Sequence, residues 1–178
     1  TYVIRFKSMG NESDKVIAYD EIKGKLELTE NDLDIVIRKS DGLPTYHLAH
    51  VVDDHFMHTT HVIRGDEWLS SVPKHIQIFN LLGFEVPKYA HLAPLLKDDN
   101  GTKRKISKRK DPEANMSYYR EHGYPIEAVI ESLMTIINTN YEEWHRENPD
   151  KTFMDFEYNP SKMSSSGGLY DLEKLNNI

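Results

Sequence analysis

The stretch DIVIRKSDGLPTYHLAHVVDDHFMHTTHVIRGDEW, residues 34–68, decides the fold of this 178-residue chain. It opens on Asp34–Arg38, a β-branched run that is typical of a buried strand. After a turn, Thr45 can N-cap a helix whose inward side chains recur at helical spacing, namely Leu48, Val51, Val52, His55 and Phe56. Residues 60–64 indicate a second short strand, which ends at Gly65. The segment therefore predicts a strand–helix–strand unit.

The same alternation continues beyond residue 68. A second helix is predicted from about Ser71 to Leu82, closed by Gly83, with inward side chains at Val72, His75, Ile76, Phe79 and Leu82. A third strand is predicted over Tyr89–Leu96. Strands that alternate with helices form parallel sheets, whose ligands bind at the carboxyl ends of the strands. We therefore expect residues 64–68 and the segment after the third strand to face one crevice.

The flanks of this region show other patterns. Before it, short strands and turns are expected, with β character at Tyr2–Phe6, Val16–Tyr19 and Ile22–Leu28. After it, helices are predicted at Ser117–Glu121 and Ile126–Ile137, and a last helix or turn at Leu172–Leu175. The charged stretch Tyr141–Asp155 is expected to be a surface connection. The predicted fold class is α/β, followed by a helical region.

The composition excludes several classes of protein. The chain is 38% hydrophobic and 29% charged, as in ordinary globular domains, and its net charge of −7 argues against nonspecific coating of nucleic acids. It has no cysteine, which excludes disulfides and thiolate metal sites. No apolar run approaches the roughly 20 residues that a membrane-spanning helix needs.

One short segment departs from this acidic composition, and we call residues 103–110 the basic segment. It reads Lys103-Arg104-Lys105-Ile106-Ser107-Lys108-Arg109-Lys110, so that six of its eight residues carry a fixed positive charge. Like charges repel one another unless an anion neutralises them, which favours a phosphate-rich partner. A solvated hairpin tip is the alternative interpretation. The position after a predicted sheet strand favours phosphate binding.

Three stretches resemble one known family. Lys105-Ile106-Ser107-Lys108-Arg109 resembles the K-M-S-K-S signature of class I aminoacyl-tRNA synthetases, in the K-I-S-K-R form of glutamyl-tRNA synthetases. Residues 40–49 are similar to the family's S-D-G-x-P-T-Y-H segment, and residues 51–69 resemble V-V-D-D-H…T-H-V-I-R-G-E-E-W. The order and spacing of the three stretches also match. The resemblance covers nearly all of residues 1–140 and, more weakly, residues 169–175.

The resemblance implies roles for individual residues. The signature lysines Lys105 and Lys108 are implied to be catalytic, and the implied ATP-binding residues are Glu67, Trp68, Leu95, Leu96 and Lys108. Tyr46 and Arg64 match positions that contact the glutamate substrate, and an arginine fork can grip a carboxylate with two hydrogen bonds. His50 stands where the family commonly has asparagine, and it could keep a polar contact with the substrate.

The implied activity is that of a glutamate–tRNA ligase, which activates glutamate with ATP and transfers it to the 3′ end of tRNA. Magnesium is expected with ATP, held largely by phosphate oxygens, and no zinc is expected in this segment. The implied acceptor is tRNA(Glu), with tRNA(Gln) as a second candidate. A cytoplasmic monomer without membrane contact is expected. Two alternatives remain open: an RNA-binding module, and a shortened synthetase paralogue that does not charge tRNA.

The resemblance also implies a division of the chain. Residues 1–34 would be the tail of an inserted acceptor-binding domain, and residues 111–178 an α-helical stem-contact region. Residues 35–110 would be the second half of a Rossmann-like parallel-sheet nucleotide-binding fold, including the signature loop. The first half, with the H-I-G-H motif, is expected to lie outside this sequence. We therefore expect the chain by itself not to form the adenylate.

Three other patterns have simpler interpretations. His47-Leu48-Ala49-His50 superficially resembles H-I-G-H but is predicted to be ordinary helix surface, since it lacks the glycine. Lys162–Ser166 also mimics the signature but lacks its second lysine. The third pattern has the composition of a metal site and is the minority interpretation, because the family segment accounts for the same residues: His50, Asp53, Asp54, His55, His58 and His61.

Overall fold

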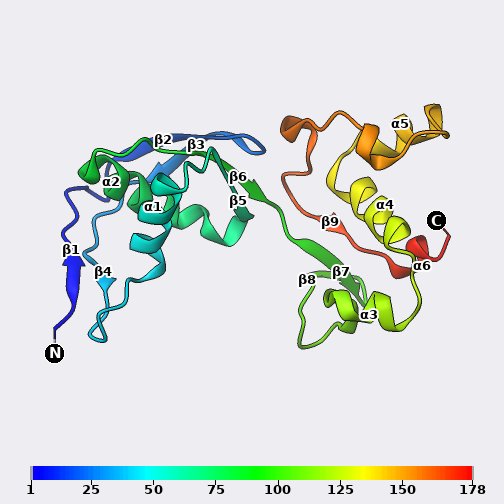
Figure 1. Cartoon of the computed structure of the whole chain (residues 1–178), viewed down its shortest axis with the longest axis horizontal. Coiled ribbons are helices and arrows are strands. Elements are labelled where there is room, and N and C mark those ends of the chain that lie inside the picture. Colours follow the sequence, from blue (N-terminus) through cyan, green and yellow to red (C-terminus); the bar gives the residue numbers. More distant parts are fainter. Residues whose placement is uncertain (1, 178) are drawn as a thin grey trace. The chain divides into compact units, whose positions relative to one another are not determined.

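The computed structural model describes residues 2–177, which divide after His91 into two compact units. Figure 1 shows the elements of each unit along the chain. Each unit has its own buried core, so each is described separately. Among the described residues, no helix combines the length and apolar composition that crossing a membrane requires.

The first unit contains a four-stranded sheet in the order β3-β2-β6-β5. Its strands are β2 (Lys15–Asp20), β3 (Gly24–Thr29), β5 (His61–Gly65) and β6 (Lys88–Leu92). β2 and β3 form an antiparallel hairpin, and β2 runs parallel to β6 where Asp20 pairs with Tyr89. The sheet therefore joins the end of β2 to β6, although the two strands lie far apart in the sequence.

The strand β4 (Ile35–Arg38) lies outside this sheet, contrary to the expectation that it joins β5 and β6. It pairs antiparallel with β1 (Ile4–Phe6). Its other edge is used by the turn that follows, because the Thr45 N–H donates to the Ile37 carbonyl at 2.8 Å and Arg38 bridges to Pro44. Both edges of β4 are thus occupied, one by β1 and the other by the turn that follows β4.

Two helices cover the first core, as the apolar spacing predicts. They are α1 (Tyr46–Phe56) and α2 (Val72–Leu82), and the 3-10 helix η1 (Asp66–Ser71) leads into α2. Gly83 ends α2 in the left-handed conformation, with φ of 68°. Thr45 does not cap α1 with its side chain, because its hydroxyl donates to the Val36 carbonyl at 2.9 Å. The buried cluster of this unit consists of Phe6, Val51, Ile78 and Phe79.

The second unit contains a three-stranded sheet in the order β8-β7-β9. Its strands are β7 (Leu95–Asp99), β8 (Thr102–Lys105) and β9 (Gly168–Leu169). Asn100 and Gly101 both have positive φ, which suits the tight hairpin turn between β7 and β8. The predicted strand Tyr89–Leu96 is therefore wrong as one element. It is divided at Pro94 into β6 and β7, which belong to different sheets.

The remainder of the second unit is helical. Its α-helices are α3 (Met116–Glu121), α4 (Ile126–Ile137), α5 (Tyr141–Glu147) and α6 (Leu172–Leu175), and its short 3-10 turns are η2 (Pro112–Ala114), η3 (Phe153–Asp155) and η4 (Pro160–Lys162). A second buried cluster joins them, made of Tyr119, Val129, Tyr170 and Leu175.

The predicted surface connection at Tyr141–Asp155 is wrong, because it contains α5 and η3. Tyr141 is fully buried, and its ring lies 5.1 Å from that of Phe156 and 5.7 Å from that of Trp144. The high acidic content of this stretch concealed these aromatic anchors. They hold α5 against the unit by burial of ring surface.

Candidate active site

Arg64 lies at the carboxyl end of β5, among aromatic rings and imidazoles. Its Nε donates to His91 Nε2 at 3.0 Å, and its Nη atoms approach His75 Nδ1 at 3.4–3.5 Å. The guanidinium lies 4.9 Å from the centre of the Tyr89 ring. Among residues 2–177, no carboxylate forms an ion pair with Arg64. The guanidinium is therefore held in place without losing its charge.

Tyr46, the first residue of α1, lies beside Arg64. Its hydroxyl accepts a hydrogen bond from Arg64 Nη1 at 3.4 Å. Its ring centre is 4.3 Å from that of Trp68, and it stacks on His50 at 5.7 Å with an interplanar angle of 6°. Tyr46 is 45% exposed, so that this aromatic wall is open to a ligand.

His50 is buried, which corrects the prediction that residues 47–50 are ordinary helix surface. Its Nδ1 lies 2.5 Å from the Asp54 carboxylate, and its Nε2 lies 3.0 Å from the Tyr89 hydroxyl. Burial lowers the pKa of His50, while the Asp54 carboxylate acts in the opposite direction. Both ring nitrogens thus have protein partners, and the ring itself supports Tyr46.

His75 on α2 is the site residue whose role the sequence did not reveal, although the helical spacing predicted that it points inward. It is fully buried, and its Nε2 lies 2.9 Å from His47 Nδ1. Burial, followed by the positive charges of His50 and Arg64, lowers the pKa of His75 to about 2. The imidazole is therefore neutral and can accept a hydrogen bond from Arg64.

The three residues predicted to bind glutamate line one groove. A hollow of about 400 Å³ between α1 and β5 is lined by Tyr46, His50 and Arg64, together with Asp53 and Asp54. The groove combines one guanidinium, one phenol and two carboxylates. It can receive a small zwitterion, because an anionic group can meet Arg64 while a cationic group meets the carboxylates.

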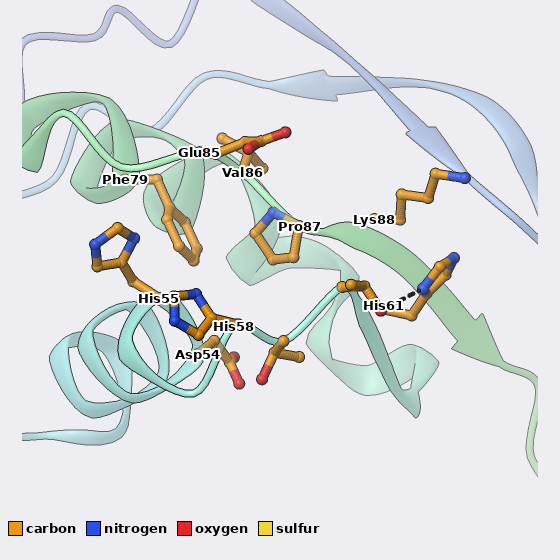
Figure 2. A pocket seen from close by; sticks show the side chains of 11 residues that line it. Asp54, His55, His58, His61, Phe79, Glu85, Val86, Pro87 and Lys88 are labelled. Atoms are coloured by element: carbon orange, nitrogen blue, oxygen red, sulfur yellow. Dashed lines mark hydrogen bonds between the residues drawn. The ribbon is translucent and has the colours of Figure 1, made fainter.

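A second hollow of about 560 Å³ shares Asp54 with the first, and Figure 2 shows the side chains that line it. His55 lies at the end of α1, His58 in the turn that follows it, and His61 at the start of β5. His55 stacks on Phe84 at 3.6 Å, and His61 Nδ1 lies 2.9 Å from the Thr60 hydroxyl. Within residues 2–177, no group of three or more metal-ligand side chains is arranged to hold an ion. The expected absence of zinc remains a prediction.

Glu67 and Trp68 belong to η1, directly after β5. Gly65 packs so closely against Glu67 that a Cβ atom at position 65 would lie 2.2 Å from the Glu67 carboxylate. Trp68 is half-buried and contacts Tyr46, whereas Glu67 is exposed. Because glycine has no side chain, the Glu67 carboxylate can lie close to the backbone at position 65.

The basic segment starts within β8 and is not simply a loop after a parallel strand, as the sequence had suggested. Lys103–Lys105 pair antiparallel with β7, with Lys105 opposite Leu96. Leu95 packs with Ile106 against the second core. Beyond β8, the chain turns at Ser107, whose carbonyl accepts the Lys110 N–H at 2.9 Å. Lys108 is exposed on this turn.

The protein itself neutralises part of the basic segment. Arg104 donates two hydrogen bonds of 2.7 Å to Asp111, and its Nε donates to Asp99 at 2.8 Å. Hydrogen bonds from Arg104 hold the pKa of Asp111 well below its usual range. Asp111 also accepts the Ser107 N–H at 2.9 Å. One of the six charges is therefore structural, and it anchors the turn that carries Lys108.

Comparison with known proteins identifies the family. Residues 1–175 match the family model described as the catalytic domain of class I tRNA synthetases (E and Q). This chain belongs to that family. The suspected resemblance to glutamyl-tRNA synthetases is thereby confirmed, since the curated relatives described next are glutamate–tRNA ligases.

Two bacterial relatives illustrate the similarity of this synthetase chain. It is 57% identical to the glutamate–tRNA ligase of Clostridium perfringens strain 13 over 178 residues, all of this chain and 33% of the relative. It is 54% identical to that of Acetivibrio thermocellus over 178 residues, again 33% of the relative. The chain thus spans about a third of the length of the curated relatives it matches.

Solved structures of the family have the same fold. The glutamate tRNA ligase of Elizabethkingia meningosepticum, solved in complex with its amino acid, matches with a TM-score of 0.80 and 34% identity, covering 98% of this chain and 37% of that one. The synthetase of Elizabethkingia anophelis matches with a TM-score of 0.79 and 32% identity, with the same coverage. The predicted α/β class with a Rossmann-like nucleotide fold is confirmed.

Within the synthetase chain, the other signature-like stretch has a structural place. Lys162 ends η4, and Met163 bridges to Asn138 after α4. The Lys162 carbonyl also accepts the Thr139 N–H at 3.3 Å. Residues 162–163 therefore tie the chain to the end of α4. The predicted segment boundaries at 34/35 and 110/111 stay predictions, as does the crevice expected between residues 64–68 and the basic segment.

Proposed function

We propose that this chain is the part of a glutamate–tRNA ligase that grips L-glutamate and contributes the signature loop for ATP. The observation that carries the proposal is the guanidinium of Arg64, which is oriented by imidazoles and has no carboxylate partner among the described residues. A positive charge that is fixed but not neutralised is suited to an anionic ligand. The family relationship supports glutamate as that ligand.

The proposed amino-acid site uses the groove between α1 and β5. Arg64 would bind a carboxylate of glutamate through its free Nη–H groups, and the Tyr46 hydroxyl would bind beside it. His50 would act on the substrate mainly through Tyr46, because its ring nitrogens contact Asp54 and Tyr89. A polar contact of His50 with the substrate remains part of the proposal.

The proposed ATP-binding residues are those that the resemblance to the family implies. Glu67 and Trp68 of η1, and Leu95 and Leu96 of β7, would each contact the adenosine of ATP. Lys108 would bind the phosphates, and Lys105 and Lys108 would neutralise the charge that develops there. Mg²⁺ would enter with ATP and be held by phosphate oxygens, which suits a chain whose described residues provide no carboxylate cage.

The proposed acceptor is tRNA(Glu), with tRNA(Gln) as a second candidate, and the proposed protein is a cytoplasmic monomer. The binding of RNA by the basic segment alone is the rival function, and the exposure of Lys103, Lys108 and Arg109 favours it. In that case RNA affinity would fall steeply with salt and would not depend on ATP. The absence of such ATP-independent binding would remove the rival.

A hybrid ligase tests the proposal. The stretch of the C. perfringens relative that matches this chain is replaced by residues 1–178, and charging of tRNA(Glu) with L-glutamate is measured. We expect activity, and we expect Arg64→Lys to raise the KM for glutamate, because an ammonium cannot reproduce the guanidinium fork. The matched control is Arg38→Lys, since Arg38 is exposed and, among residues 2–177, its side chain donates only to the Gly42 carbonyl. An inactive but folded hybrid would contradict the proposal.

A further inference from the structure

A buried aspartate lies behind the His91 ring that contacts Arg64. The Asp20 side chain at the end of β2 is 1% exposed. Its Oδ1 accepts the backbone N–H groups of Ile22 and Lys23 at 3.0 and 2.9 Å. Its Oδ2 lies 3.0 Å from the His91 backbone N and 2.6 Å from His91 Nδ1. Every contact of this carboxylate is thus with a donor.

The position of Asp20 decides which nitrogen of His91 carries the proton. An ionised carboxylate can only accept, so Nδ1 must be the protonated nitrogen and Nε2 must present its lone pair. That lone pair faces Arg64 Nε at 3.0 Å. A proton on Nε2 would place one donor against another. The carboxylate therefore controls, through one imidazole, whether Arg64 can form this hydrogen bond.

A neutral acceptor has a consequence for the charge of the site. A carboxylate in direct contact with Arg64 would orient the guanidinium and neutralise it at once. His91 orients it from Nε, and His75 from the Nη side, without adding a negative charge beside it. Arg64 also lines the groove together with Tyr46 and His50, and its Nη1 donates to the Tyr46 hydroxyl at 3.4 Å. The arrangement separates orientation of the guanidinium from neutralisation of its charge.

We propose that Asp20 and His91 are positioning residues for Arg64, and that Asp20 acts by holding His91 in the tautomer with its proton on Nδ1. The part of this inference that concerns substrate binding rests on the proposed function, because it takes Arg64 to bind glutamate. The part that concerns the tautomer does not depend on any function.

The first experiment is nitrogen NMR of the imidazoles and of the Arg64 Nε–H in the 178-residue chain. We expect His91 to be protonated at Nδ1 and unprotonated at Nε2, with a slowly exchanging Arg64 Nε–H. In Asp20→Asn, the side-chain oxygen keeps the hydrogen bonds from the N–H groups of Ile22 and Lys23. The amide nitrogen, which is a donor, then faces His91 Nδ1. The imidazole proton should then move to Nε2, and exchange of the Arg64 Nε–H should accelerate at least about ten-fold.

Matched variants separate positioning from folding. Glu21→Gln changes the neighbouring carboxylate, which forms an exposed pair with Lys88, and should leave both NMR signals unchanged. The longer side chain of His91→Gln can place an amide oxygen near the position of Nε2, where it can accept from Arg64. The shorter side chain of His91→Asn reaches only the position of Nδ1, where it can donate to Asp20. Protection of the Arg64 Nε–H should survive better in His91→Gln than in His91→Asn. Protonation of wild-type His91 at Nε2, or equal protection in the two His91 variants, would overturn the proposal.

The second experiment uses the hybrid ligase and measures KM and kcat for L-glutamate. Asp20→Asn should raise the KM about ten-fold, which corresponds to ~1.4 kcal/mol of binding free energy, with a smaller change in kcat. His91→Gln should recover part of that loss relative to His91→Asn. If the tautomer shifts and Arg64→Lys raises the KM, but Asp20→Asn leaves the KM unchanged, the substrate role of Asp20 is overturned and the proposed function of Arg64 stands. If Arg64→Lys also leaves the KM unchanged, the proposed function fails, while the tautomer assignment is unaffected.

Discussion

The carboxylate of Asp111 holds the guanidinium of Arg104 through two hydrogen bonds of 2.7 Å each. The same carboxylate accepts the N–H of Ser107, the serine of the signature sequence. A residue four positions beyond the serine thus fixes the start of the turn on which Lys108 lies. The geometry of the signature loop depends on this buried anion as well as on the loop's own sequence.

Replacing Asp111 by asparagine should loosen the signature loop. The amide cannot accept from both guanidinium nitrogens and from Ser107 at once, so amide exchange at Ser107 should accelerate at least about ten-fold. Asp99→Asn is the matched control, because Asp99 binds the same guanidinium from an exposed position. Hydrogen exchange followed by NMR is the measurement. Equal effects of the two variants would show that Asp111 has no special part in fixing the loop.

The stability of the first unit should fall as the solution becomes acidic. The pKa of His75 is about 2 in the folded chain, below the ordinary 6.5, because burial and the charges of His50 and Arg64 disfavour its protonation. The unfolded chain therefore binds a proton as the pH falls below 6.5, whereas the folded chain does not. The free energy of unfolding is therefore not reduced by His75 above pH 6.5. Between pH 6.5 and about pH 2, the titration of His75 lowers it by roughly 1.4 kcal/mol per pH unit.

Urea unfolding of the first unit between pH 7.5 and 5 measures this slope. His75→Gln should lower stability at pH 7.5 but make the dependence on pH shallower, because one titrating group is lost. His61→Gln is the control, since His61 is exposed on β5. His47, His50 and Lys74 also face His75 and shape its titration. An unchanged slope in His75→Gln would mean that the acid sensitivity arises at these neighbours.

Gly65→Ala should impair ATP binding without unfolding the chain. The new Cβ would come within 2.2 Å of the Glu67 carboxylate, which lies at the end of a flexible side chain and can move away. The φ of Gly65 is −66°, so alanine causes no backbone strain. In the hybrid ligase we expect the KM for ATP to rise several-fold, while the melting temperature stays within about 2 °C. A normal KM would remove Glu67 from the proposed ATP site.

Lys108→Ala in the hybrid ligase should reduce the rate of tRNA charging by about 10²-fold or more if Lys108 has its proposed role, because it would then supply preorganised charge beside the reacting phosphates. Lys103→Ala provides the comparison, since Lys103 is an exposed lysine of the same segment within β8. The Lys103→Ala variant should lose much less of the charging rate. Measurement of kcat under saturating ATP and glutamate separates the catalytic effect from binding. Similar losses in the two variants would indicate a general electrostatic effect of the basic segment.

Local patterns were sufficient for the main helices and for the family. The apolar spacing of α1, α2 and α4 predicted their positions within a residue or two, and Gly83 marked the end of α2. The signature sequences at residues 40–49, 51–69 and 105–109 predicted the family, because each is a contiguous string. Periodicity and contiguous motifs can be read from neighbours in the chain, so no knowledge of distant contacts was needed.

Long-range contacts decided the features that the sequence did not reveal. β4 pairs with β1, and Pro94 divides a predicted single strand between two sheets. Asp20 reaches His91 across 71 positions, and His75 meets Arg64 from another element. Taken alone, Asp20 resembles an ordinary surface carboxylate, and the inward spacing of His75 does not reveal its partner. Which hydrogen-bond partner lies opposite a buried group depends on how strands and helices pack. Arg64 can only donate, so what the packing decides is that the acceptor opposite its Nε is His91.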